Sequence, residues 1–352
     1  MKSQQRVVLR QVASLAGVSL GTASNVFADK PGVSLKARLA VLAAAKELGY
    51  QPQPRTLARQ LPPYSEQTNF TTFGLVIRSM QIPFPTNPFY SPVLHGAENA
   101  CTAQHVSLMY AVVEVSETSD TDIHLPLMVQ RKQTHGLLVV GYFPETFFAL
   151  LQKEAIPFVT VDYYDPGLQV DSVTGADEEG GYLATKYLLA HGFRQPIPAM
   201  IAGPFSHTSL YYRWRGYKRA LEEEGLTYNE DYVRYGDTNF SGGYHAMCEL
   251  LEVKPRPEAI FCSSDMTALG ALNALNEHGI KVPEECSLIG YDDIDLAAIT
   301  APPLTTVHVD KRQLGIQGVR QLLERLSSPE MPPLHTSIAV TIVERRSVQQ
   351  KE

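Results

Sequence analysis

The sequence has 352 residues, a hydrophobic fraction of 44% and a formal net charge of −7. This length predicts two or three globular domains, and no segment approaches the roughly 20 consecutive apolar residues that a membrane span requires. Because no apolar run of the signal-peptide kind stands at the N-terminus, we expect a cytoplasmic protein with no membrane partner.

The first predicted element is a helix–turn–helix over Leu9–Ala28. Apolar residues at helical spacing predict a first helix that Gly17 ends, and Ser19 is suited to cap a second helix. The residues expected to face outward on the second helix are Leu20, Gly21, Thr22, Ser24 and Asn25. A turn this short can present the second helix to the DNA major groove, and two helices of a small bundle are the alternative.

The charge distribution supports the DNA-binding alternative. Residues 1–61 hold nine Lys or Arg against two acidic residues, a net charge of +7. Since the whole chain has a net charge of −7, the other 291 residues carry −14. A basic head on an acidic body is typical of a DNA-binding domain joined to a different domain.

A third helix is predicted from Leu35 to Leu48, ended by Gly49. The three helices are expected to share one small core that includes Val12, Val18, Val26 and Leu42.

The next segment, Arg55–Leu61, can form two helical turns that Pro62 and Pro63 end. So short a helix is unstable alone in water because nucleation is costly, and we expect it to be helical only when another surface packs against it. Ser65–Thr72 is polar and reads as a linker.

From Phe73 onward, short apolar strands alternate with helical segments. Strands are predicted at 73–77, 106–113, 136–141, 158–162, 197–202, 232–235, 259–262 and 287–291, and helices at 91–104, 122–131, 145–154, 178–191, 210–224, 242–251 and 266–278. This alternation predicts two doubly wound α/β subdomains with parallel sheets, in which ligands bind beyond the carboxyl ends of the strands.

Enzymatic chemistry finds no support in the sequence. There is no GxSxG, no glycine-rich phosphate loop and no HExxH motif. The four cysteines form no CxxC pair, and the ten histidines show no metal-ligand spacing. We therefore expect no catalytic residues, no metal and no cofactor.

The order of these parts resembles the lac repressor and galactose repressor family of bacterial transcription regulators. In the head the resemblance rests on Val12-Ala13, Ala16-Gly17-Val18-Ser19, Val33-Ser34 and Leu48-Gly49-Tyr50. In the body it rests on Asn87-Pro88-Phe89-Tyr90, Arg213-Trp214-Arg215-Gly216-Tyr217, Ser264-Asp265-Met266-Thr267 and Gly290-Tyr291-Asp292-Asp293. Each motif is weak alone, but their order and spacing cover nearly the whole chain.

The resemblance implies an all-α head and an α/β core like that of a periplasmic sugar-binding protein, in which the chain crosses between subdomains three times. The implied domains are a helix–turn–helix domain (1–50), a hinge helix and linker (51–71), an N-subdomain (72–174 plus 309–336) and a C-subdomain (175–308 plus 337–352). It also implies a homodimer that grips a near-palindromic, double-stranded operator and responds to a small-molecule effector. The resemblance is compatible both with an effector that releases DNA and with one that promotes DNA binding.

The residues that read DNA depart from the family pattern. Asn25 stands where arginine is usual, and asparagine favours adenine whereas arginine favours guanine. By resemblance, Ala58 and Leu61 belong to the hinge helix, and Leu61 wedges into the minor groove, where an apolar side chain kinks the duplex. The alternative is that Leu61 packs on the core. Hydroxyls of Ser19, Thr22 and Ser24 suit phosphate contacts.

The expected effector residues follow the strands of the core: Asn87, Phe89, Tyr90, Asp162, Arg213, Ser264 and Asp292. A carboxylate–guanidinium pair beside aromatic rings suits a sugar. Asp293 is expected to cap a following helix, and Arg213 could instead pair with Glu222 or Glu223. The long loop over 78–86 could reshape the cleft mouth. A solute-binding protein that serves a transporter is the alternative function, against which the basic head and absent signal peptide argue.

Overall fold

The computed structural model describes residues 9–27, 35–48, 50, 70–80, 82–115 and 123–351, apart from the side chains of residues 25, 27, 35 and 36. The chain divides into two compact units, residues 1–67 and residues 68–352. None of the described helices is both long and apolar enough to cross a membrane.

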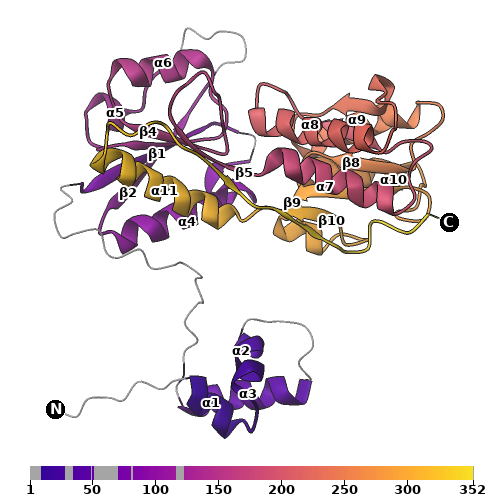
Figure 1. Cartoon of the computed structure of the whole chain (residues 1–352), viewed down its shortest axis with the longest axis horizontal. Helices are drawn as coiled ribbons and strands as arrows, with labels where there is room; N and C mark the ends of the chain where they lie inside the picture. Colours follow the sequence, from indigo (N-terminus) through magenta and orange to yellow (C-terminus); the bar gives the residue numbers. More distant parts are fainter. Residues whose placement is uncertain are drawn as a thin grey trace. The chain divides into compact units, whose positions relative to one another are not determined.

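The first unit contains three helices, α1 (Leu9–Leu15), α2 (Leu20–Phe27) and α3 (Leu35–Leu48) (Figure 1). Their shared core is built from small apolar side chains: Val12, Ala13, Ala23, Val26, Val41, Ala44 and Ala45. The prediction of Leu42 as a core residue is wrong, because 47% of it is exposed while Val41 is fully buried. Positions 41, 44, 45 and 48 follow the i, i+3, i+4, i+7 pattern, so the buried stripe of α3 lies one residue away from the predicted one.

The second unit, which we call the core, contains two six-stranded sheets. Sheet A has the order β11 (His335–Ile338), β5 (Asp171–Gly175), β4 (Phe158–Val161), β3 (Leu137–Val140), β1 (Thr72–Arg78) and β2 (Ser107–Val113), and all its pairs are parallel. Sheet B has the order β12 (Thr341–Val343), β10 (Thr305–His308), β9 (Ser287–Asp292), β8 (Ala259–Cys262), β6 (Ala199–Ala202) and β7 (Val233–Tyr235), with β12 antiparallel to β10.

Helices cover both faces of each sheet (Figure 1). On sheet A, α4 (Tyr90–Ala103) and α11 (Lys311–Ser327) cover one face, and α5 (Leu127–Gln130) and α6 (Glu145–Lys153) cover the other. On sheet B, α7 (Asp177–Ala190) packs beside α8 (Thr208–Glu223) on one face, and α9 (Phe240–Leu251) beside α10 (Asp265–Glu277) on the other. Short 3-10 turns lie at Phe84–Thr86, Glu230–Tyr232 and Asp295–Ala298. We call the sheet A half lobe A and the sheet B half lobe B.

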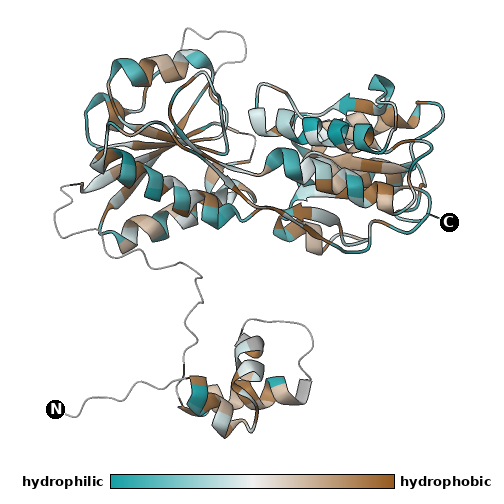
Figure 2. Ribbon diagram, viewed as in Figure 1, coloured by the Kyte–Doolittle hydropathy of each residue, from teal (hydrophilic) through white to brown (hydrophobic). Residues whose placement is uncertain are grey.

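Alternating side chains along the strands build two layers of core in each lobe. In β1, Leu75 and Ile77 pack toward α4 and α11, whereas Val76 packs toward α5 and α6. Figure 2 shows the strands largely in brown between helices whose outward sides are teal. Strands that are apolar on both faces are typical of parallel sheets covered by helices, which confirms the predicted fold class.

The chain passes between the lobes three times, as the resemblance implied. It leaves sheet A after β5, returns after β10 to form α11 and β11, and leaves again to form β12. The sequence reasoning missed β5, β10, α11, β11 and β12. β5 reads Asp-Ser-Val-Thr-Gly, yet all five residues are buried, since β4 and β11 flank it and Arg325 neutralises Asp171 at 2.7 Å.

Candidate functional site

The turn between α1 and α2 has the predicted geometry. Gly17 adopts a left-handed backbone with φ of +64°, and the N–H of Val18 donates to the carbonyl of Ala13 at 3.0 Å. The N–H of Thr22 donates to Ser19 Oγ at 3.0 Å. Glycine therefore ends α1 and serine caps α2, which confirms both assignments and holds the two helices across one short turn.

α2 separates buried residues from those predicted to read DNA. Ala23 and Val26 are buried, whereas 47% of Leu20 is exposed. Gly21 is exposed, and Thr22 and Ser24 are half-buried. The predicted contacts at Ala58 and Leu61, and the side chain of Asn25, lie outside the described residues.

We predict that Ser19→Ala costs α2 about 1 kcal/mol, because the Thr22 amide then lacks its side-chain acceptor. Hydrogen exchange at that amide should become roughly fivefold faster. Ser19→Asn retains a capping oxygen and is the control, so equal acceleration in both variants would contradict the capping role.

A cavity of about 820 Å³ opens between the two lobes at the carboxyl ends of the strands. All seven predicted effector residues line it. The loop after β1 also contributes, since Met80 and Ile82 line the cavity while Phe84 is buried against Tyr110 at a ring distance of 5.8 Å. The structure therefore gathers residues that are more than 200 positions apart into one cleft.

Arg213 is the centre of the charged network in the cleft. It is 4% exposed, and its Nε donates to Asp177 Oδ1 at 2.9 Å while one terminal nitrogen donates to Asp292 Oδ1 at 3.1 Å and to the Ser263 carbonyl at 2.7 Å. The guanidinium also lies 3.7 Å from the ring centre of Tyr291. The alternative pairing with Glu222 or Glu223 is wrong, because the Arg213 side chain lines the cleft and binds Asp177 and Asp292 instead.

Burial shifts the titration of this network. Burial raises the pKa of Asp292 to about 6, although Arg213 and Lys311 oppose the shift. Burial likewise raises the pKa of Asp177, again against Arg213. Burial alone would lower the pKa of Arg213, but the two carboxylates raise it, so the guanidinium stays charged.

Asp162 joins the lobes on the opposite wall of the cleft. Its Oδ2 accepts from the Tyr90 hydroxyl at 2.9 Å and lies 3.5 Å from His207 Nε2, and Ser209 Oγ donates to its carbonyl at 3.3 Å. Burial and Asp162 raise the pKa of Tyr90 well above its usual range, so the phenol remains a donor. Asp162 and Asp292 both have positive φ, +61° and +106°, at the ends of β4 and β9.

Three of the singled-out residues have local roles that the sequence did not settle. Asn87 Oδ1 accepts from the amides of Phe89 and Tyr90, and Ser264 Oγ caps α10 by accepting from Thr267. The prediction that Asp293 caps a helix is wrong. Its carboxylate binds His308 Nδ1 at 2.8 Å and Arg345 at 2.6 Å, and these hydrogen bonds outweigh burial and hold the pKa of Asp293 at about 2.

The sequence reasoning missed three residues that line the cleft, His207, Asp237 and Asn239. It also missed Asp177, which pairs with Arg213 from outside the cleft lining. Asp237 and Asn239 line the cleft just beyond β7, so the rule for strand ends could have found them. Among the described residues, no three His, Cys, Asp or Glu side chains gather as a metal site would require.

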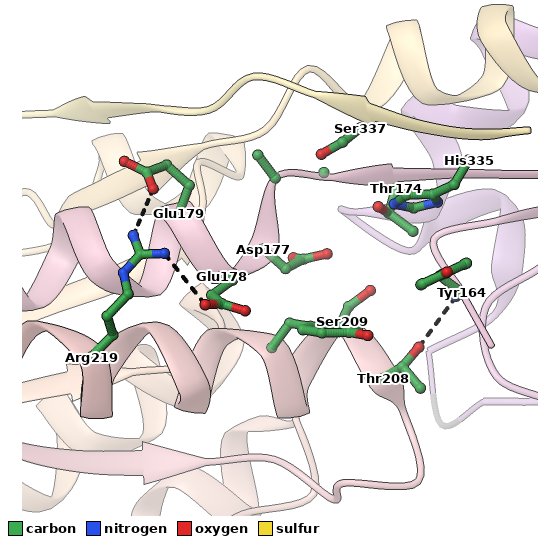
Figure 3. A pocket seen from close by; sticks show the side chains of 13 residues that line it. Tyr164, Thr174, Asp177, Glu178, Glu179, Thr208, Ser209, Arg219, His335 and Ser337 are labelled. Carbon is green, nitrogen blue, oxygen red and sulfur yellow. Dashed lines mark hydrogen bonds and ion pairs between the residues drawn. The ribbon is translucent and has the colours of Figure 1, made fainter. Parts of the chain in front are cut away.

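A smaller cavity, of about 360 Å³, is lined by Asp177 and by residues of α7 and α8 (Figure 3). Arg219 bridges Glu178 and Glu179 from α8, and Tyr164 stacks on His335 at 4.1 Å. Arg219 is thus paired with Glu178 and Glu179, and Asp177 is paired with Arg213 outside the cavity, so these four charged side chains already have partners and we assign the cavity a structural role.

The comparisons with known proteins agree with this arrangement. Residues 8–53 match bacterial regulatory proteins of the lacI family, and residues 185–348 match a periplasmic binding protein-like domain. The HTH-type transcriptional repressor PurR of Haemophilus influenzae is 35% identical over 322 residues, which are 91% of each chain.

Solved structures extend the likeness to the whole chain. A transcriptional regulator CelR–cellobiose complex has a TM-score of 0.71 at 30% identity, covering 97% of this chain and 100% of that chain. The lac repressor dimer bound to operator and the anti-inducer ONPF has a TM-score of 0.67 at 27% identity, covering 98% and 100%. With its capped helix–turn–helix, its two-lobed core and these relatives, the chain belongs to the lacI family of bacterial regulatory proteins, a family of DNA-binding transcriptional repressors and not of enzymes.

Proposed function

We propose that this protein represses transcription as a homodimer on a near-palindromic operator, under the control of a neutral sugar that binds in the cleft. The observation that carries the proposal is the buried Arg213–Asp292 pair, which faces a large cavity on a chain that also carries a helix–turn–helix. The pair can form hydrogen bonds with ligand hydroxyls. A ligand that occupies a cavity between two lobes favours the lobe orientation to which it binds more tightly.

The proposed DNA interface is α2 together with the hinge residues. Leu20, Gly21 and Asn25 would face base edges, and the hydroxyls of Ser19, Thr22 and Ser24 would contact phosphates. Ala58 and Leu61 would enter the minor groove at the operator centre, with Leu61 and its dimer mate kinking the duplex.

We predict that a binding selection from random DNA returns adenine at the base pair that Asn25 faces. Asparagine makes two hydrogen bonds to adenine, whereas arginine makes two to guanine, and a good bidentate pair discriminates by about 1–3 kcal/mol. Asn25→Arg should shift the selected base to guanine. If both proteins select guanine, Asn25 does not read that position.

The chemistry of the cleft favours a neutral ligand that is rich in hydroxyl donors. Three carboxylates, Asp162, Asp237 and Asp292, outnumber the two arginines, Arg78 and Arg213, that line the cavity, and the Arg213 charge is already shared between two carboxylates. A phosphorylated ligand would face this acidic wall, whereas hydroxyls can donate to it. The rings of Phe89, Tyr142 and Phe240 can cover apolar sugar faces. The CelR relative is solved with cellobiose.

The proposed dimer is supported by apolar side chains that the core leaves exposed. In lobe B, 77% of Ile299 is exposed, and in lobe A 51% of Tyr110 is exposed on the edge strand β2. Apolar residues and an unpaired strand edge are features that proteins normally cover. A palindromic operator also requires a two-fold symmetric protein, and the lac repressor relative is a dimer on its operator.

The deciding experiment has two arms. A gel-shift assay at low salt with operators taken from the selection tests DNA binding, because counterion release most favours association there. A thermal-shift panel of neutral sugars, their phosphates and nucleobases then tests the effector, since a ligand stabilises the state it binds. Absence of any DNA binding would refute the regulator, and stabilisation by only phosphates or nucleobases would refute the neutral sugar.

A further inference from the structure

The turn that carries Asp292 into the cleft has an unusual backbone. Asp292 and the next residue, Asp293, have φ of +106° and +54°, a region that non-glycine residues rarely adopt. On the sheet B side, Asp265 Oδ2 accepts the N–H of Ile294 at 2.9 Å and so fixes the end of the turn. Such a backbone persists only where its surroundings hold it.

The side chain that holds the remaining part of the turn comes from the other lobe. Lys311 is the first residue of α11 and is 8% exposed. Its Nζ donates to the carbonyl oxygens of Asp292, of Asp293 at 3.0 Å and of Val309 at 3.2 Å. The three donors of the buried ammonium thus all bind backbone carbonyl oxygens, two in the turn and one in the segment that crosses between the lobes.

α11 is joined to α4 without intervening side chains at two places. A Cβ atom added to Gly96 of α4 would lie 2.0 Å from the carbonyl oxygen of Arg312, and one added to Gly315 would lie 2.0 Å from that of Val93. Because backbone meets backbone with no space between them, a displacement of one helix is transmitted to the other. Arg312 directly follows Lys311, so the contact with Gly96 lies beside the residue that holds the turn.

α4 also connects to the cleft and to the head. Its first residue, Tyr90, lines the cleft and donates its hydroxyl to Asp162, which follows β4 in the same lobe. The helix belongs to lobe A, whose first strand, β1, follows residues 51–71 in the chain. A displacement of α11 at Lys311 therefore reaches the lobe through which the core is joined to the DNA-binding head.

We propose that Lys311 is a positioning residue that transmits effector occupancy at Asp292 to α4, by coupling the Asp292–Asp293 turn to the first turn of α11. The proposal rests on the proposed effector site. If Lys311 only stabilised the turn, its loss would lower stability and effector affinity but would leave intact the effect of bound effector on DNA.

The test measures the ratio of operator Kd with and without the panel sugar that gives the largest thermal shift, in the full-length protein. Coupling factors of this kind are typically about 5–150. In Lys311→Met we expect the factor to fall below about 3, with operator affinity alone within about threefold of the original protein. Lys311→Arg retains buried donors and should restore part of the factor. Lys281→Met, at an exposed lysine of lobe B, should leave it unchanged.

If the coupling factor of Lys311→Met at saturating sugar equals that of the original protein, the proposed role of Lys311 is overturned while the proposed function stands. If no panel sugar stabilises the original protein or changes its operator Kd, the proposed function fails, and the proposed role of Lys311 fails with it. Lys311→Gln, which retains two N–H donors, is a second and milder variant that tests the proposal if Lys311→Met fails to fold, and the same direction of change is expected.

A second measurement needs no effector. Hydrogen exchange of the folded protein should become at least about tenfold faster in Lys311→Met both at the Ile294 amide and in the first two turns of α4. Acceleration confined to residues 292–294 would mean that Lys311 acts only locally, and would overturn the proposal.

Discussion

Arg213→Met is expected to destabilise the core by about 3–5 kcal/mol, because it leaves two buried carboxylates without their shared cation. Asp177 and Asp292 lie 2.9 Å and 3.1 Å from the guanidinium, and both are at least nine-tenths buried. The methionine side chain fills much of the vacated volume, so the loss reports mainly on charge. Urea unfolding of the two proteins measures it.

The matched control is Arg215→Met, two residues along the same helix. Arg215 is 46% exposed and forms an ion pair with Glu178 at 3.3 Å. Solvent screens such a pair, so we expect a change below about 1 kcal/mol. Equal losses at the two positions would show that Arg213 contributes through helix packing and not through its charge.

The loss at Arg213 should also depend on pH. Burial already raises the pKa of Asp292 to about 6 and raises that of Asp177, and removal of the cation raises both further. A carboxyl with a raised pKa binds a proton in the folded state that the unfolded chain has released, so stability falls as pH rises from about 4 through the raised pKa. The deficit of Arg213→Met should therefore be smaller at pH 5 than at pH 8.

Asp292→Asn is expected to weaken effector binding by about 10- to 100-fold, because hydrogen bonds to a charged acceptor contribute about 1.5–3 kcal/mol. Operator affinity without effector should change little, since Arg213 retains Asp177. Calorimetry with the panel sugar and gel-shift with the operator measure the two quantities. Loss of both activities would show that Asp292 is structural.

The neighbouring Asp293 is the control for this substitution. Its carboxylate turns away from the cleft to His308 and Arg345, whose hydrogen bonds overcome burial and keep its pKa at about 2. Burial places the pKa of Asp292 at about 6, so the effector Kd should rise about tenfold between pH 7.5 and pH 5. This pH dependence should disappear in Asp292→Asn and persist in Asp293→Asn.

Features of the fold that depend on neighbouring residues were predictable. Gly17 ends α1 and Ser19 caps α2, because both act on backbone groups within three or four residues. Apolar runs such as Leu137–Val140 form buried strands because parallel sheets bury both faces. β5 and β11 could not be predicted in this way, because both are polar. β5 is buried only because β4 and β11 flank it, and β11 is a partly exposed edge strand that pairs with a strand far earlier in the chain.

Within the site, the sequence determined which strand ends carry polar side chains, and all seven chosen effector residues line one cleft. That result follows because parallel strands end at the same edge of a sheet. The sequence likewise determined the helix–turn–helix, whose turn is a local backbone conformation.

Only the tertiary structure decided the partners of these residues. It placed Asp177 against Arg213, turned Asp293 away from the cleft and brought Lys311 onto the carbonyls of the Asp292 turn. It also showed that Val41, and not Leu42, packs in the head. These outcomes depend on contacts between residues that are far apart in the chain or on the rotation of a helix against its neighbours, and no local pattern encodes either one.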